Sequence, residues 1–294
     1  MAQPKFELPI PQAKYCIVSF PASNVLLVTL NRAKDLNCVN MDGHRELDAL
    51  WSWMDAEPGL ACGILTGSGR AFSAGADLKG EYLSVCLRST MLTRLFAEWN
   101  NTNQTGQKRA HPPGGFCALS RRSGRKPVIA AVNGICYGGG CEAIINADMV
   151  VAAKKATFAL PEVKIGVAAQ AGALPRLIRT VGKPRAMEMA LTGRTISAAE
   201  AREWGLVNKV VGDGDGEVVN AAVEYAKMIA ANSPDAVIVT RESIKLGWEA
   251  VGAEDGTRMS NEIWGPRLQA GDNLKEGIAS FVEKRKPQWK PSKL

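Results

Sequence analysis

The stretch KPVIAAVNGICYGGGCEAII, residues 126–145, contains a strand pattern followed by a glycine-rich helix start. The segment KPVIAAVNG (126–134) predicts a strand, and glycines 138–140 stand where this strand leads into a helix. The first N–H groups of a helix lack intrahelical partners and carry partial positive charge. Gly139 can therefore donate a hydrogen bond to a developing oxyanion, and Glu142 follows one turn along the same helix face.

Similar strand-then-helix units flank this segment. Strand CGILTG (62–67) leads into GRAFSAGADLK (69–79), and strand DMVVAA (148–153) precedes TFALPE (157–162). Upstream, residues 15–20 and 25–30 predict a hairpin, and the apolar spacing over 42–55 predicts a helix. This alternation predicts an α/β fold with a largely parallel sheet.

The chain becomes helical in character from residue 197. Ser197 and Glu200 form a capping-box pattern, an apolar stripe covers 218–230, and a last helical segment is expected near 272–284. We therefore divide the chain into a core domain, 1–196, and a C-terminal helical region, 197–294.

The composition of the chain argues against several classes of site and partner. The chain has 294 residues, 46% of them hydrophobic, and no apolar run long enough for a spanning helix, so no membrane partner is expected. The seven cysteines include no CxxC pair, which indicates neither a zinc site nor a disulfide framework. The net charge of +7 comes from scattered basic residues without interleaved aromatics, so nucleic-acid binding is not expected either. With only two histidines, His44 and His111, carboxylates are the natural acid/base candidates.

Two further segments supply candidate chemistry. Small residues at 74–76 let a backbone approach a ligand closely, and the N–H of Ala76 can act with that of Gly139 as a two-donor oxyanion hole. Asp77 can cap a following helix. Pro161 presents Glu162 from a loop, and two carboxylates near one oxyanion hole can share acid and base roles.

The glycines also fit a competing pattern. Gly138, Gly140 and Ala143 match the loose dinucleotide fingerprint GxGxxG/A. In that motif the strand runs directly into the first glycine, whereas residues 134–137 intervene here. No clean ribose-binding acid ends the next strand, so the sequence argues against nucleotide binding.

Taken together, these segments resemble the crotonase (enoyl-CoA hydratase/isomerase) superfamily over nearly the whole chain. The resemblance begins at LLVTLNRAKDLN (26–37), includes GRAFSAGADLK, KPVIAAVNG, GGGCE and LPEVKIG, and ends in LKEGIASFVEKRKPQW (274–289). It implies a spiral of ββα units with a C-terminal helical trimerisation region, assembled as a homotrimer or hexamer.

The resemblance also assigns roles to residues. It implies that the N–H groups of Ala76 and Gly139 hold the thioester carbonyl and that Glu142 and Glu162 act on water and the α-proton. It implies further that the CoA arm is lined by Lys34 and by the segment containing Ala74, Ala76, Asp77, Leu78 and Lys79. No metal or redox cofactor is implied, because coenzyme A is part of the substrate. Retention of both glutamates favours hydratase or dehydratase chemistry over enoyl-CoA isomerase, CoA-ester hydrolase or a non-catalytic binding role.

One departure bears on the acyl group. Where the family commonly reads GxxPGxGGxQRL, this chain reads GVAAQAGALPRL (166–177), so Gln170 replaces a glycine. We expect its side chain to bond a hydroxyl or carbonyl of a short, branched or hydroxylated acyl-CoA. Mevalonyl-CoA, in peroxisomal siderophore synthesis, is one such substrate.

A second departure lies at residues 80–97, GEYLSVCLRSTMLTRLFA, which the family pattern lacks. Joining Lys79 to Glu98 restores GADLKEWN, and back-translation permits splice-donor, branch and acceptor sequences at the junctions. We interpret this stretch as a retained intron; the rival interpretation is a lid helix that packs its leucines.

The final residues Ser292, Lys293 and Leu294 form the tripeptide SKL, a receptor-read peroxisomal address. The expected location is the peroxisome, with the import receptor as a protein partner.

Overall fold

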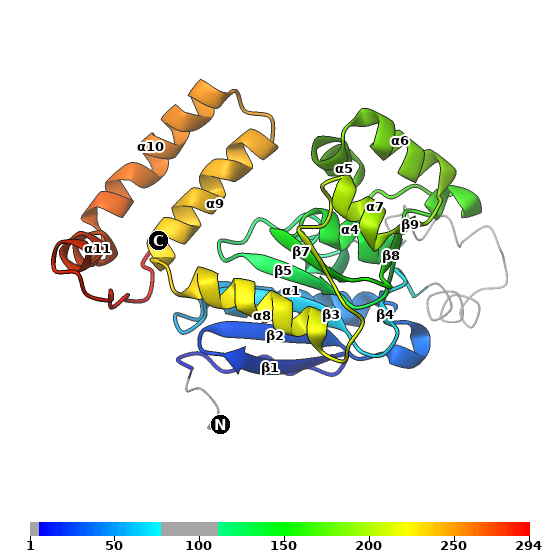
Figure 1. Ribbon diagram of the computed structural model, residues 1–294, viewed down its shortest axis with the longest axis horizontal. Helices are drawn as coiled ribbons and strands as arrows, with labels where there is room; N and C mark the ends of the chain where they lie inside the picture. The colour runs from blue at the N-terminus through cyan, green and yellow to red at the C-terminus, as the bar shows by residue number, and fades with distance from the viewer. Residues whose placement is uncertain (1–5, 78–110) are drawn as a thin grey trace, which may run out of the picture.

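The computed structural model describes residues 6–77 and 111–294 (Figure 1). The expected hairpin is formed by β1 (Cys16–Ala22) and β2 (Val25–Leu30), which pair antiparallel. β2 then pairs in parallel with β3 (Cys62–Gly67), and β5 (Val128–Val132), β7 (Met149–Ala153) and β10 (Lys209–Val211) continue the six-stranded sheet. The predicted α/β fold with a largely parallel sheet is confirmed.

A second, smaller sheet accounts for segments that the strand-then-helix pattern did not assign. Its order is β4 (Ala71–Ser73), β6 (Ile135–Tyr137), β8 (Thr157–Ala159) and β9 (Ile196–Ser197). Each unit thus places one strand in each sheet: β3 then β4, β5 then β6, and β7 then β8. The residues between β5 and the glycines are strand β6, so the geometry of a dinucleotide-binding βαβ unit is absent from this segment.

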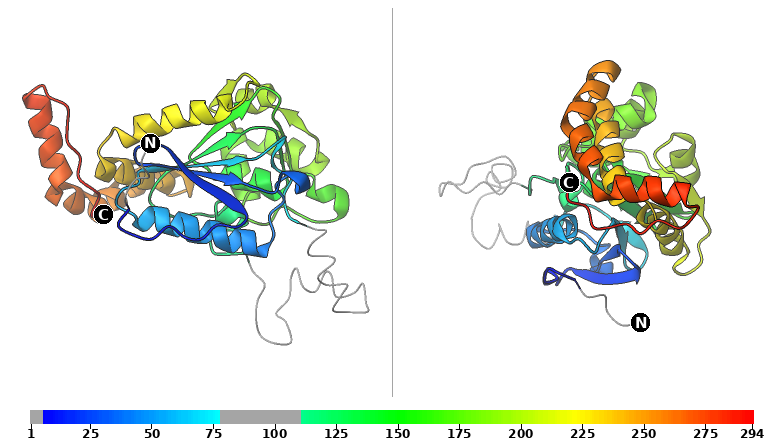
Figure 2. Two further views of the ribbon diagram at one scale, coloured as in Figure 1. Left: turned by 90° about the horizontal axis from the view of Figure 1, so that it is seen from below. Right: turned by 90° about the vertical axis from the view of Figure 1, so that its left-hand side faces the viewer.

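The large sheet is covered on both faces (Figure 2). Side chains alternate along a strand, so Ile64, Ile129 and Val151 face α8 (Glu217–Ala230), which contributes Val218 and Ala222. On the opposite face, Leu65 and Val132 belong to the main core with α1 (Met41–Ala56). This core extends beneath the second sheet through Phe72, Cys136 and Phe158. The two sheets are therefore fixed to each other by one apolar interior.

Helices complete the chain on either side of the sheets. The short α4 (Gly139–Ile145) follows β6, and the 3-10 turns η1 (Ala33–Asp35), η2 (Phe116–Ala118) and η3 (Glu162–Ile165) lie in connecting segments. After η3 come α5 (Leu174–Val181), α6 (Lys183–Thr192) and α7 (Ala198–Glu203), and α7 has the predicted capping box between Ser197 and Glu200. The expected boundary between the core domain and the C-terminal helical region, at residue 196, falls inside β9. β10 and α8 lie beyond this boundary, yet both pack in the core.

The last helices stand beside the sheets in Figure 1: α9 (Pro234–Trp248), α10 (Ala253–Ala270) and α11 (Asp272–Val282). Ser233 caps α9, and Pro234 stands in its first turn, so α9 begins shortly after the end of α8. In the described part of the chain, no helix combines the length and the apolar character that crossing a membrane needs.

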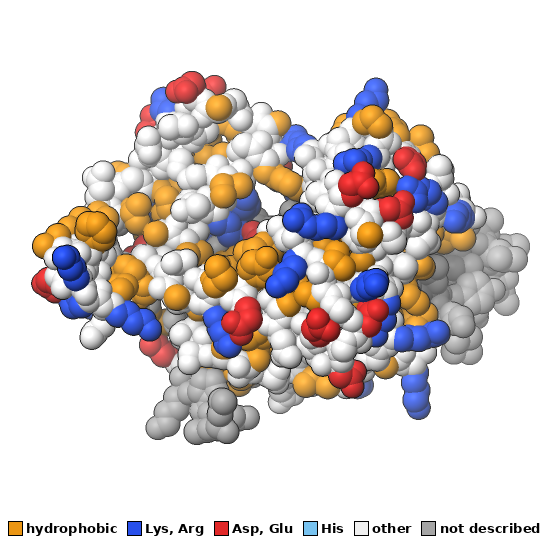
Figure 3. Space-filling model, in the orientation of Figure 1, with side chains coloured by type: hydrophobic (Ala, Val, Ile, Leu, Met, Phe, Trp, Pro, Cys, Tyr) orange, Lys and Arg blue, Asp and Glu red, His pale blue; other side chains and the backbone are white. Residues whose placement is uncertain are grey.

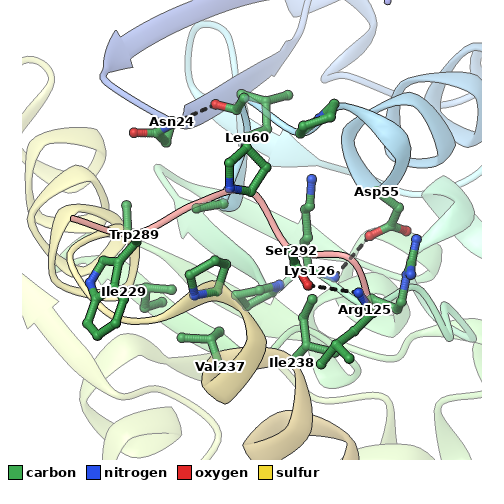
Figure 4. Close-up of a pocket in the computed structure, with 18 of the residues that line it drawn as sticks. Asn24, Asp55, Leu60, Arg125, Lys126, Ile229, Val237, Ile238, Trp289 and Ser292 are labelled. Carbon is green, nitrogen blue, oxygen red and sulfur yellow. Dashed lines mark hydrogen bonds between the residues drawn. The ribbon is translucent and has the colours of Figure 1, made fainter. Parts of the chain in front are cut away.

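The C-terminal tail folds back onto the body of the protein (Figure 4). The Trp289 indole donates to the Ala231 carbonyl, and Ser292 and Leu294 line a cavity of about 230 Å³ near the end of α1. Lys126 lies in the same region, where its ammonium donates to the carbonyls of Met54 and Glu57. This cavity lies at the amino ends of β3 and β5.

Leu78, Lys79 and the segment 80–97 lie outside the described residues.

Candidate active site

Three parallel strands of the small sheet end side by side. Ser73 of β4 is in register with Cys136 of β6, and Tyr137 of β6 is in register with Ala159 of β8. Because parallel strands end at the same edge, the segments that follow them must meet there. These segments begin at Ala74, Gly138 and Leu160, and they contain six of the residues that the sequence predicted for the site.

The two predicted amide donors are brought together. A Cβ atom on Gly75 would lie 3.2 Å from the backbone nitrogen of Gly139, so the segments after β4 and β6 are in close contact. Val39 donates to the Gly75 carbonyl and accepts from the Asp77 N–H, which turns the N–H of Ala76 to the other side. Gly139 opens α4, where its N–H has no intrahelical partner. Neither N–H donates to another described residue.

A cavity of about 510 Å³ lies against these donors. Glu142 enters it from α4, where its side chain is buried and 5% exposed. Glu162 enters from the start of η3, directly after Pro161. Both carboxyl groups therefore line one cavity with Ala76 and Gly139.

The pKa values of the Glu142 and Glu162 carboxyl groups are higher than that of a surface glutamate. Burial, and then the nearby Glu162, raise the pKa of Glu142 from its ordinary 4.5 to about 7. The N–H of Ala173 donates to Glu142 Oε2 at 3.4 Å and opposes this shift. Burial also raises the pKa of Glu162, whose Oε2 is buried without a hydrogen-bond partner among the described residues. Near neutral pH the pair can hold one proton between them, which is what paired acid and base catalysis needs.

Other predicted residues are placed differently. Ala74 and Gln170 also line the cavity, and the Gln170 side chain is exposed there. Lys34 lies exposed on η1 and does not line it. Asp77 forms an ion pair with Arg32 at 2.7 Å and likewise lies outside the cavity lining.

His111 and Phe116 are among the cavity residues that the sequence analysis did not select. A Cβ atom on Gly139 would lie 2.3 Å from the Phe116 ring, so only glycine leaves space for this contact. The available signal was the Pro- and Gly-rich stretch HPPGG (111–115), which indicates a loop but not its position. Among the described residues there is no cluster of His, Cys, Asp or Glu that could hold a metal ion.

Comparison with known proteins identifies the family that the sequence motifs resemble. The Enoyl-CoA hydratase/isomerase profile matches residues 21–292. The crystal structure of enoyl-CoA hydratase from Mycobacterium tuberculosis H37Rv superimposes with a TM-score of 0.79 at 32% identity, covering 95% of this chain and 99% of that one. The chain belongs to the enoyl-CoA hydratase/isomerase family, whose hydratases are lyases that act on CoA thioesters.

Two curated relatives are more similar in sequence. The mevalonyl-coenzyme A hydratase SIDH of Beauveria bassiana is 51% identical over 94% of this chain and 95% of that protein. The mevalonyl-coenzyme A hydratase sidH of Aspergillus fumigatus is 46% identical over 97% of this chain and 98% of that protein.

The raised pKa of Glu142 predicts a pH-dependent cost to stability. Between about pH 4.5 and 7 the folded chain binds more protons than the unfolded chain, so the free energy of unfolding falls as pH rises through this window. Glu142→Gln removes this cost. We expect it to stabilise the protein by roughly 1–3 kcal/mol at pH 8 and by much less at pH 5.

Thermal or urea unfolding at the two pH values measures this difference. The exposed Glu7 provides the matched control, Glu7→Gln, which should show no such gain at pH 8. A stability gain for Glu142→Gln of equal size at both pH values would contradict the buried-carboxyl account.

Proposed function

We propose that this hydratase acts on a branched, hydroxylated acyl-CoA of the mevalonyl-CoA type. The observation that carries the proposal is one cavity that joins the buried Glu142, the half-buried Glu162, two amide N–H groups that donate to no other described residue, and the exposed side chain of Gln170. The names of the two fungal relatives support the same substrate class. The substrate loses water between its α and β carbons, or regains it in the reverse direction.

The amide donors supply the electrostatic part of the mechanism. The thioester carbonyl oxygen accepts hydrogen bonds from the N–H groups of Ala76 and Gly139. Negative charge builds on this oxygen when the α-carbon loses its proton, so donors fixed in place bind the enolate more tightly than the ground state. Each donor of this kind contributes roughly 3 kcal/mol to transition-state stabilisation.

The two glutamates supply the proton transfers. In dehydration, one ionised carboxylate takes the α-proton, and the other, protonated carboxyl gives its proton to the departing β-hydroxyl, which leaves as water. In hydration the same steps run backwards. A water molecule between the two carboxyls can return the proton to the starting arrangement. The roles require one charged and one neutral carboxyl, and mutual repulsion in a buried site favours that state.

The test is turnover of a β-methyl-δ-hydroxy enoyl-CoA, followed as loss of the conjugated thioester absorbance. We expect the parent protein to hydrate it with a higher kcat/KM than crotonyl-CoA. Glu162→Gln should lower kcat by about 10²- to 10⁴-fold, with circular dichroism unchanged. Equal or better turnover of crotonyl-CoA would contradict the substrate assignment, and full activity of Glu162→Gln would contradict the mechanism.

We also propose that the chain assembles into a homotrimer or hexamer. Ile278, Phe281 and Val282 of α11 are 59%, 85% and 72% exposed, and hydrophobic side chains gather over this helix in Figure 3. Apolar surface of this kind on a terminal helix favours association. Light scattering should give the mass of three or six chains, and Phe281→Glu should lower it. Ile17→Glu, at another exposed apolar position, should not. A monomeric parent would contradict the proposal.

The peroxisomal location stays a proposal that rests on Ser292, Lys293 and Leu294. Lys293 is exposed, whereas Ser292 and Leu294 are partly covered. We expect the full chain to accumulate in peroxisomes and a chain lacking these three residues to remain in the cytosol. Unchanged location after their removal would contradict the import role.

A further inference from the structure

The loop 111–120 is held in a strained shape beside the glutamates. Cys117 and Ala118 adopt φ values of 54° and 48°, in the left-handed region that non-glycine residues rarely enter. The Cys117 N–H donates to His44 Nδ1 at 3.1 Å, and the Trp51 indole donates to the Cys117 carbonyl at 3.0 Å. Such strain persists only where surrounding contacts impose it, and it marks functional positions.

His44 acts as the fixed support of this loop. Its side chain is 1% exposed, and burial lowers its pKa to about 3, so the ring is neutral at physiological pH. Because Nδ1 accepts a hydrogen bond, the proton sits on Nε2. The ring packs edge-on against both His111 and Phe116, with centroid distances of 4.6 Å to each. The buried ring of His44 therefore supports the ring of His111 from inside the protein.

One nitrogen of the His111 ring has no hydrogen-bond partner among the described residues. The ring lines the cavity, and its Nδ1 atom is buried with no hydrogen bond to any described residue. Buried polar atoms in proteins are almost always paired, and an unpaired one is costly unless a ligand or water satisfies it. A small rotation of the His111 ring, or a bridging water, would let Nδ1 form a hydrogen bond with a ligand in the cavity.

The cavity segment that contains Gln170 is linked to the loop 111–120 by hydrogen bonds through Ser120. Ser120 Oγ accepts from the Phe116 N–H at 2.8 Å and donates to the Ala171 carbonyl at 2.6 Å. This bridge fixes the loop and the segment around Gln170 relative to each other. Besides the two glutamates and the exposed Lys164, His111 and Gln170 contribute the polar side chains among the described lining residues.

We propose that His111, supported by His44 and acting with Gln170 of the same cavity, binds a hydroxyl on the acyl chain beyond the β-carbon and so determines substrate specificity. This role rests on the proposed function. His111 touches the substrate without taking part in the proton transfers, and His44 is a positioning residue.

The chemistry of the two side chains matches an alcohol. A neutral imidazole offers one donor and one acceptor, and a hydroxyl offers one donor and two acceptor lone pairs. Burial lowers the pKa of His111, so the ring does not supply the positive charge that a carboxylate or phosphate on the chain would need. A site built to pair with a hydroxyl rejects the analogue without it, because the polar group of the site is then left unpaired.

The test compares two substrates that differ only at this position: a β-methyl-δ-hydroxy enoyl-CoA and its δ-deoxy analogue. The readout is the ratio of their kcat/KM values, so a general loss of activity cancels. We expect a ratio of about 10² or more for the parent, and at least a tenfold smaller ratio for His111→Phe. His111→Gln should keep most of the preference, because an amide can still pair with the hydroxyl. Lys164→Met, which removes another polar side chain from the cavity lining, should leave the ratio as it is.

The outcomes separate the two proposals. If the parent hydrates crotonyl-CoA but neither branched substrate, the proposed function fails. If the parent hydrates the hydroxylated substrate but His111→Phe retains the full ratio, the role of His111 is overturned while the proposed function stands. Loss of the preference in Lys164→Met as well as His111→Phe would also overturn it, since the effect would then not be specific to the ring.

Discussion

The parallel register of β4, β6 and β8 fixes the positions of the residues that line the candidate site. Three parallel strands that end at one edge bring together segments separated by up to about 90 residues, from Ala74 to Glu162. Their closeness requires glycine at the contacts: a Cβ on Gly140 would lie 2.6 Å from the Ser73 carbonyl oxygen, and one on Gly139 would meet the Phe116 ring. The backbone amides thereby approach one another without side chains between them, and their donors remain free for a substrate.

The same burial that stabilises the fold sets up the proposed chemistry. α4 is buried along its length, so Glu142 is carried into a low-dielectric cavity where a charged carboxylate is costly. Glu162 enters the same cavity from a different segment and adds repulsion. In the proposed mechanism this shared cost is useful, because it keeps one carboxyl neutral as an acid and leaves the other as a base. Under the proposed mechanism, the protein gives up stability at neutral pH to hold two groups in complementary protonation states.

Periodicity predicted much of the large sheet but not the small one. The runs 62–67 and 126–134 are apolar and long enough to be recognised as strands. The first coincides with β3, and the second contains β5 but extends two residues beyond it at each end. β6, β8 and β9 have two or three residues each, which is too short for any alternation to be read. The arrangement of two strands per unit came from the family resemblance. Gln170 was found as a departure from a family pattern, whereas the placement of His111 depends on how a loop packs against His44, which no local pattern encodes.

In the proposed mechanism, Glu142 and Glu162 act as one proton-sharing unit beside the amide donors. The most direct test is a double-mutant cycle on kcat for the hydration reaction, with Glu142→Gln, Glu162→Gln and the double variant. Groups that act as a unit are strongly non-additive, so the account predicts that the double variant is about as slow as the slower single variant. If the fold-losses in kcat of the two single variants multiply in the double variant, the two glutamates contribute independently. That result would contradict a proton-sharing unit.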